Sequence, residues 1–212
     1  MKKIITLLEN LTNKKVVLEN SVFKSRKMDE RLISFKKELE KSMIIDEPNK
    51  TIIINKNIKY PDCLVLEKFY QGYLIDVKGD VDVSCKELKQ LPLINFNKIT
   101  GSFCCNQNQL TSLQYSPKEV DRSFLCYNNQ LTSLQYSPTK VGRSFWCSNN
   151  QLTSLKYCPK EVGRNFLCFN NQLINLQYCP KEVGGSFSCY NNSKKFTKED
   201  VEKYCKVGKK IE

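Results

Sequence analysis

The sequence predicts an α/β-class solenoid in which turns of about 21 residues stack around a shared apolar core, with one parallel β-sheet of about six rungs, one rung per turn. A phenylalanine recurs every 21 residues, a cysteine follows it by two positions, and an asparagine follows the cysteine by three. The phenylalanines are Phe103, Phe124, Phe145, Phe166 and Phe187; the cysteines are Cys105, Cys126, Cys147, Cys168 and Cys189; the asparagines are Asn108, Asn129, Asn150, Asn171 and Asn192.

Further positions keep the same period. They are two leucine columns (Leu110, Leu131, Leu152, Leu173 and Leu113, Leu134, Leu155, Leu176), a proline column (Pro117, Pro138, Pro159, Pro180) and a valine column (Val120, Val141, Val162, Val183). A fixed period of this length is typical of arrays in which each unit buries its apolar side against its neighbours.

Each column has an expected structural part. Phe-x-Cys is the alternation of a short strand with two inward side chains. An asparagine at the strand end can bond backbone groups of its own and adjacent turns. Leu-x-x-Leu then turns the chain inward around the bend, and Pro-x-x-Val predicts a short irregular or 3₁₀ return on the convex side, because 21 residues leave little room for a long helix.

The chain divides into a helical and short-strand segment over residues 1–72, the solenoid over 73–192, and a capping helix with a tail over 193–212. Apolar spacing predicts helices over residues 1–12 and 25–43, the second with Met28, Leu32, Phe35 and Leu39 on one face. Short strands are expected at Thr51–Asn55, at Cys63–Phe69, and in two pieces of Tyr73–Ser84.

Both ends of the array depart from the repeat. Val81 and Val83 take the phenylalanine and cysteine positions of a first rung, whose residues differ from those of the later copies. At the other end, Thr197 is the expected N-cap of a short helix and Asp200 reaches back to it; Val201, Tyr204 and Cys205 are expected to face one way. This helix is expected to cover the last turn.

Composition limits the function classes. The net charge is +12 and histidine is absent; the excess of lysine and arginine reflects either an acidic partner or an AT-rich coding sequence. No stretch of 18 apolar residues and no signal peptide with a cleavage site are found, so we expect a cytoplasmic protein that does not enter a membrane. Without histidine, a glycine-rich phosphate loop or clustered carboxylates, we expect no enzyme and no cofactor.

The 11 cysteines do not read as a disulfide framework. Five stand in one inward column, and Cys158 and Cys179 replace Ser116 and Ser137 of another. We expect free buried thiols in a reducing compartment. Oxidation between neighbouring turns is the alternative, whereas the zinc-ligand spacing is missing and no metal is expected.

The run Asn128-Asn129-Gln130-Leu131-Thr132-Ser133-Leu134 and its copies, preceded by the strand, resemble the leucine-rich repeat with Phe and Cys in two of its leucine positions. The similarity is to the short bacterial, phage and giant-virus type and covers roughly residues 73–207. It implies a surface for protein binding and no catalytic apparatus, in the host cytoplasm if the chain is viral. Effector relatives carry a large C-terminal ligase domain, and only 20 residues follow the last copy here.

Outward strand positions vary between copies while the inward ones hardly change. These positions line the expected concave face and carry large apolar groups: Leu125, Tyr127, Trp146, Leu167, Phe169 and Tyr190. Such a strip is either a partner site, a self-association surface, or the result of sequence drift in repeats that are losing their similarity. Arg122, Arg143 and Arg164 form a second outward column, either a solvated edge or a site for phosphates or carboxylates.

We therefore expect a non-catalytic scaffold that binds an unknown protein partner on its concave face. The arginines are expected to attract an acidic rim of that partner. The alternative is a basic solenoid that binds nucleic acid nonspecifically. The tyrosine column (Tyr115, Tyr136, Tyr157, Tyr178) is expected to belong to the outer wall, with a nucleotide-stacking platform as the alternative.

Overall fold

The computed structural model describes residues 29–212, which fall into two units, one ending at Lys41 and one spanning Ser42–Glu212. In the first unit, residues 29–40 form the expected helix, which carries an ion pair between Lys36 and Glu40 one turn apart. The expected helix over residues 1–12 and the position of Met28 lie outside the described residues.

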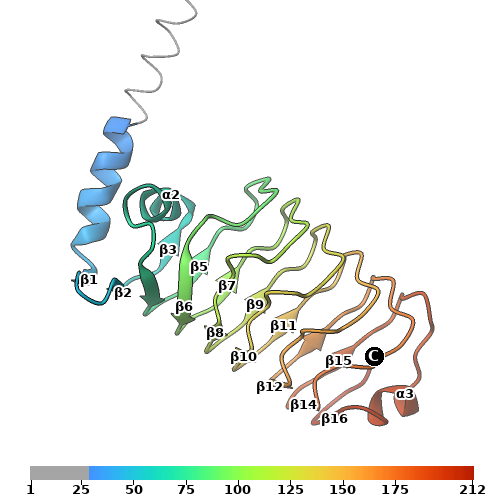
Figure 1. Ribbon diagram of the computed structural model, residues 1–212. Helices are drawn as coiled ribbons and strands as arrows, with labels where there is room; N and C mark the ends of the chain where they lie inside the picture. Colours follow the sequence, from blue (N-terminus) through green and yellow to red (C-terminus); the bar gives the residue numbers. More distant parts are fainter. Residues whose placement is uncertain (1–28) are drawn as a thin grey trace, which may run out of the picture. The chain divides into compact units, whose positions relative to one another are not determined.

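The second unit is a solenoid with two sheets, one on each side of the core, whose strands are parallel except for Met43–Asp46, which pairs antiparallel with Thr51–Ile54 (Figure 1). The nine-stranded sheet, called sheet A here, runs β1 (Met43–Asp46), β2 (Thr51–Ile54), β4 (Leu74–Val77), β6 (Asn95–Ile99), β8 (Glu119–Val120), β10 (Lys140–Val141), β12 (Glu161–Val162), β14 (Glu182–Val183), β16 (Lys206–Val207). The seven-stranded sheet B contains β3 (Ile58–Lys59), β5 (Val81–Asp82), β7 (Phe103–Cys104), β9 (Phe124–Leu125), β11 (Phe145–Trp146), β13 (Phe166–Leu167) and β15 (Phe187–Ser188).

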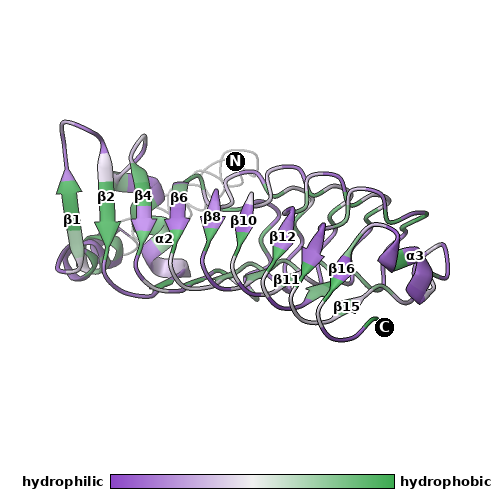
Figure 2. Ribbon diagram, turned by 90° about the horizontal axis from the view of Figure 1, so that it is seen from below, coloured by the Kyte–Doolittle hydropathy of each residue, from purple (hydrophilic) through white to green (hydrophobic). Residues whose placement is uncertain are grey.

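The predicted solenoid is thus confirmed, with one more rung than the six expected and with a second sheet. Each residue pairs with its copy one turn away: Phe145 with Phe166 in sheet B and Val141 with Val120 in sheet A. The returns that we expected to be irregular or 3₁₀ form sheet A, because the residues after each proline are extended and join the ladder of the neighbouring turn. Figure 2 shows these strands side by side, with β1 at the end of the row.

The core is the set of repeated inward side chains. Phe124, Phe145 and Phe166 have no solvent exposure, and neighbouring rings stack with centroids 5.5 and 5.7 Å apart. The cysteine, leucine and valine columns are at most 3% exposed. Because every turn buries the same groups against the next, the array has one continuous apolar interior.

The asparagine column behaves as expected. The amide nitrogen of Asn171 donates to the carbonyl oxygens of Cys147, in the preceding turn, at 3.0 Å and of Cys168, in its own turn, at 3.1 Å. Its Oδ1 atom accepts from the backbone N–H of Leu152 at 3.0 Å. These bonds satisfy backbone groups that stacking removes from water.

The ladders extend toward the N-terminus beyond residue 73, where the recognisable repeat begins. β2 pairs in parallel with β4, and β3 with β5. Between β3 and β4 the chain forms helix α2 (Tyr60–Phe69), so the strand expected at Cys63–Phe69 is wrong. A short apolar run does not distinguish strand from helix; here Pro61 in the first turn and Asp62, which accepts from the Lys59 N–H, start a helix that buries Cys63, Val65 and Leu66.

At the C-terminal end, helix α3 (Lys198–Glu202) begins at Thr197, whose hydroxyl accepts from the Asp200 N–H at 3.2 Å, as predicted. Val201 and Cys205 are buried, but Tyr204 is 42% exposed, contrary to expectation. The chain then makes part of another turn: β16 pairs with β14, and Ile211 bridges to Phe187. Helix α3 therefore occupies the return of this turn.

Candidate functional site

The outward positions of sheet B hold the apolar residues singled out above. In each two-residue strand the phenylalanine points into the core, so the following residue points out. Leu125, Trp146 and Leu167 are therefore aligned by the parallel register of β9, β11 and β13. All three are half-buried, so each retains apolar area that a partner can cover.

The second outward column continues this surface through aromatic contacts. The Tyr127 ring lies 5.6 Å from that of Trp146, at an interplanar angle of 51°. The Phe169 ring stacks on Tyr190 at 4.6 Å and 6°. We call these six residues (Leu125, Tyr127, Trp146, Leu167, Phe169, Tyr190) the aromatic strip.

The aromatic strip is less exposed than the alternation alone suggests. Only Tyr190 is largely exposed, at 45%; the other five members are half-buried, since neighbouring rings cover one another. The strip is also interrupted by small polar residues, because Ser148 and Ser188 occupy equivalent outward positions and are both 2% exposed. Among the described residues, the indole nitrogen of Trp146 is a buried donor without an acceptor.

The three arginines are exposed and lie where each sheet A strand leads into the next sheet B strand. Their backbones form a ladder, with the Arg143 N–H donating to Arg122 O and the Arg164 N–H to Arg143 O, both at 2.9 Å. In the described part of the chain, no ion pair joins any of the three to an acidic group. An anionic partner would therefore meet three exposed arginine side chains with no internal carboxylate to displace.

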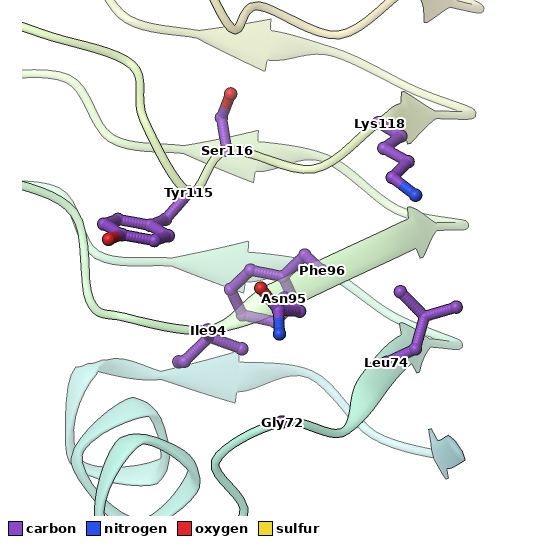
Figure 3. Close-up of a pocket in the computed structure, with 8 residues that line it drawn as sticks. All are labelled: Gly72, Leu74, Ile94, Asn95, Phe96, Tyr115, Ser116 and Lys118. Carbon is purple, nitrogen blue, oxygen red and sulfur yellow. The ribbon is translucent and has the colours of Figure 1, made fainter. Parts of the chain in front are cut away.

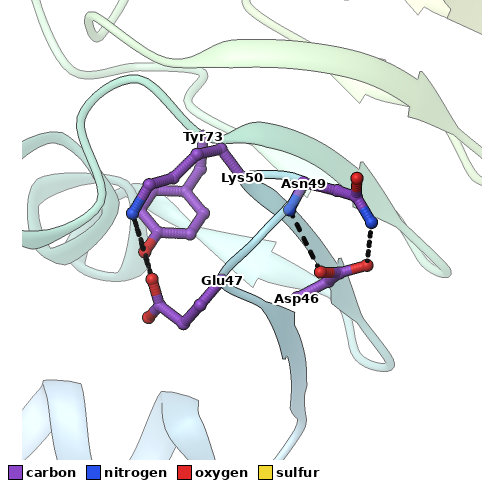
Figure 4. A network of polar contacts seen from close by, with 5 residues as sticks. All are labelled: Asp46, Glu47, Asn49, Lys50 and Tyr73. Atoms are coloured by element: carbon purple, nitrogen blue, oxygen red, sulfur yellow. Dashed lines mark hydrogen bonds and ion pairs between the residues drawn. The ribbon is translucent and has the colours of Figure 1, made fainter.

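Other surface features lie outside the aromatic strip. Three members of the tyrosine column, Tyr136, Tyr157 and Tyr178, are 53%, 51% and 55% exposed. Figure 4 shows a polar network at the β1–β2 hairpin, where Lys50 Nζ lies 3.1 Å from both Glu47 Oε2 and Tyr73 Oη. The sequence does not predict this network, since Tyr73 lies 23 and 26 residues from its partners Lys50 and Glu47.

The described residues line several pockets that are open to solvent. The pocket in Figure 3, of about 290 Å³, lies between neighbouring turns where Tyr115, Ser116 and Lys118 meet Ile94, Asn95 and Phe96. It adjoins the register shift between β4 and β6. Across residues 29–212, no group of three or more histidine, cysteine, aspartate or glutamate side chains is placed to hold a metal ion.

The thiols of the cysteine column are held in the neutral form. Burial raises the pKa of Cys126, Cys147 and Cys168 well above its ordinary value of 9.0. The pKa of Cys104 is raised to about 11, by burial first and by Asp82 second. These side chains remain neutral thiols at physiological pH, in keeping with a packing role.

The fold and this surface define a parallel-strand solenoid with a 21-residue period and an aromatic strip along one sheet. No family model matches the chain, and neither the curated proteins nor the solved structures searched include a match. Within the described residues, none of the helices combines the length and apolar character that crossing a membrane requires.

Proposed function

We propose that the chain is a non-catalytic scaffold that binds a protein partner on the outer face of sheet B, through the aromatic strip. One observation carries the proposal. The strip occupies the outward positions of turns whose inward positions hardly change, and its side chains lie side by side with apolar area still accessible. Packing of the core does not require large apolar groups there, whereas a partner interface does.

The composition of the strip suits an interface. Trp146 stands in the middle of an aligned row with Leu125 and Leu167 on either side. Tryptophan and tyrosine are enriched among the residues that dominate binding energy, and rings already packed against one another lose little side-chain entropy on binding. Arg122, Arg143 and Arg164, exposed at the corner that leads into the same strands, would draw an acidic partner toward the strip.

The resemblance to the short leucine-rich repeat agrees with this proposal, since that family presents binding surfaces on regular strands. Under the proposal the chain belongs to the short bacterial, phage and giant-virus type of that family and acts in the cytoplasm, which is the host cytoplasm if the chain is viral. The 21-residue period, the strand and the asparagine turn support this kinship.

The test compares partners captured from the native cell by wild-type protein, Trp146→Asp and Tyr190→Lys, with Lys140→Asp on sheet A as the control. Lys140 is exposed on the opposite sheet, so its change leaves the strip intact. We expect both strip variants to lose a protein that the wild type and the control retain. Tyr190 is exposed enough for its replacement to leave the fold unchanged, which circular dichroism checks. Identical captures by all four baits would refute the assignment.

The exposed arginine ladder supports a second candidate, nonspecific binding of nucleic acid. Replacing Arg122, Arg143 and Arg164 together by glutamine would then weaken binding of single-stranded or duplex probes in a gel-shift assay. Affinity would fall with salt, with a log–log slope of about −0.7 to −0.9 per phosphate contacted. Absence of any shift at low salt would remove this candidate and leave the protein-binding proposal untouched.

A further inference from the structure

A column of small polar side chains links successive turns on the side of the solenoid that carries the exposed tyrosines. Ser116 donates from its hydroxyl to the carbonyl oxygen of Tyr136, in the next turn. Ser137 makes the same bond to Tyr157 O at 2.6 Å. Cys158, which replaces serine in the following turn, directs its Sγ to Tyr178 O at 3.0 Å. Each of these turns is thus tied to the next by one side-chain bond in addition to those of the asparagine column.

The next member of the column, Cys179, has no tyrosine carbonyl to reach, because helix α3 stands in the next turn where the counterparts of Gln177–Pro180 would fall. Its thiol donates instead to the sulfur of Cys205. The backbone holds this second cysteine in place, since the N–H of Cys205 donates to Val201 O and that of Lys206 to Lys181 O, both at 2.9 Å. Cys179 and Cys205 are 7% and 3% exposed, close enough to the surface for a small oxidant to reach them.

We propose that Cys179 and Cys205 are a disulfide-forming pair that fastens the last partial turn to the solenoid when the protein meets a peroxide. The backbone brings the two residues together, because Lys206, which follows Cys205, donates its N–H at 2.9 Å to the carbonyl oxygen of Lys181, two residues after Cys179. Both side chains are buried there between the final two turns and hydrogen-bond with each other, whereas the other cysteine of this column, Cys158, contacts a backbone oxygen. The bond would join the start of β14's turn to the residue preceding β16, and would enclose α3 in the closed loop.

The chemistry assigns different parts to the two thiols. Because the Cys179 thiol donates to it, the pKa of Cys205 lies below its ordinary value, which favours the thiolate there. The thiolate attacks one peroxide oxygen, an S–O bond forms, the O–O bond breaks, and hydroxide leaves to take up a proton. Cys179 sulfur then attacks Cys205 sulfur; the S–S bond forms, the S–O bond breaks, and the leaving hydroxide takes the Cys179 proton. Two sulfurs are oxidised, and one peroxide is reduced to two waters.

The oxidised and reduced states would differ in the mobility of the C-terminal turn. In the reduced state, residues 206–212 are held by short ladders at the end of each sheet, where local opening is easiest. A covalent link at Cys205 restricts that opening. Hydrogen exchange of the amides in residues 198–212 is expected to slow by about tenfold or more on oxidation.

The experiment treats the full chain with hydrogen peroxide, blocks remaining thiols with N-ethylmaleimide, and analyses an unreduced digest by mass spectrometry. We expect a peptide pair joined through Cys179 and Cys205 that reductant separates. Cys179→Ser, which restores the serine of earlier turns, and Cys205→Ser should both lack it, and the slowing of exchange should be lost with it. Cys158→Ser, the matched control, should keep both.

Two results would overturn the proposal. One is oxidation of other cysteines, in a protein that stays folded, without any Cys179–Cys205 link. The other is a link that forms through Cys158 and survives Cys179→Ser. Because Cys179→Ser introduces a residue that this column already contains, the test does not depend on a variant that fails to fold.

Discussion

The Oδ1 atom of Asn129 accepts a hydrogen bond from the backbone N–H of Leu110, one turn earlier, at 3.0 Å. The amide nitrogen of the same asparagine donates to the carbonyl oxygens of Cys105 at 3.0 Å and Cys126 at 3.1 Å. One side chain therefore satisfies three backbone groups from two turns. These groups have no access to water, so their partner cannot be replaced by solvent.

Asn129→Ala is expected to lower the free energy of unfolding by about 2 to 4 kcal/mol, because it leaves buried donors and acceptors unpaired. Asn129→Asp keeps the acceptor but removes both donated bonds, and should cost a comparable amount. Urea denaturation followed by circular dichroism measures both. The exposed neighbour Gln130→Ala is the control, with an expected change below about 0.5 kcal/mol. An equally small change for Asn129→Ala would show that the column does not hold the turns together.

The tyrosine column has a backbone conformation that favours glycine. Tyr136 has φ of 71° and is 53% exposed. Tyr136→Gly is expected to leave stability within about 1 kcal/mol of wild type, because relief of the left-handed strain offsets the greater freedom of the unfolded chain. Tyr136→Val should destabilise by more than about 1 kcal/mol, since a β-branched residue tolerates this region poorly. Thermal denaturation of the glycine and valine variants measures both changes. A valine variant more stable than the glycine variant would contradict the conclusion that the backbone of Tyr136 is strained.

The cysteines are expected to divide sharply in reactivity. Cys85 is exposed, whereas Cys126, Cys147 and Cys168 are fully buried with a raised pKa. At about pH 8 a soluble disulfide reagent should modify Cys85 at least about a hundredfold faster than those three, which react only after the turns open. Timed labelling with mass spectrometry measures each site, with urea-unfolded protein as the control. Equal rates in the folded protein would mean that the cysteine column is not packed inside.

The β1–β2 hairpin is expected to be sensitive to acid. Hydrogen bonds from Tyr73, and next from Lys50, lower the pKa of Glu47 from its ordinary value of 4.5. The folded carboxyl thus binds a proton less readily than the unfolded one, and its contribution to stability is present above pH 4.5 and lost as pH falls through the lowered pKa.

Tyr73→Phe removes the largest cause of that shift. The variant should open its hairpin amides more than wild type above pH 4.5, with the difference shrinking as pH falls through the lowered pKa. Hydrogen exchange across a pH series, corrected for the intrinsic rate, gives the measurement. Glu47→Gln should lose the part of the acid dependence that is due to Glu47 and keep the part due to Asp46, whose pKa is also lowered, by hydrogen bonds from Asn49. A difference that persists unchanged at low pH would place the effect in packing of the Tyr73 ring.

The period alone was enough to predict the solenoid and its interior. Because each turn repeats the contacts of its neighbour, a residue such as Phe145 is buried for the same reason as Phe124 and Phe166. The same reasoning places Asn171 at the junction of two turns. Both predictions depend only on spacing and on residue type, which the sequence states directly.

Where the spacing breaks, prediction from the sequence was less successful. Val207 and Ile211 repeat the positions of Val183 and Phe187, but 24 residues later, because α3 lengthens the return. The signal was the run Val-Gly-x-x-Ile, which matches Val-Gly-x-x-Phe of earlier copies. The solvent exposure of the aromatic strip was also overestimated. Contacts such as the stacking of Phe169 on Tyr190 depend on side-chain geometry, which the spacing of residues in the sequence does not reveal.

Between residues 98 and 188 the paired strand residues lie in register with their counterparts 21 positions away, so the length of the array can change by whole turns. If residues 124–144 were deleted or duplicated in tandem, the strands of the two turns that meet at the new junction would pair in the same register as before. Genes with such internal copies shorten and lengthen readily by unequal recombination, and here each event would remove or add one intact layer. The distance between the two ends can thus vary in steps of a single turn without any redesign of the interior.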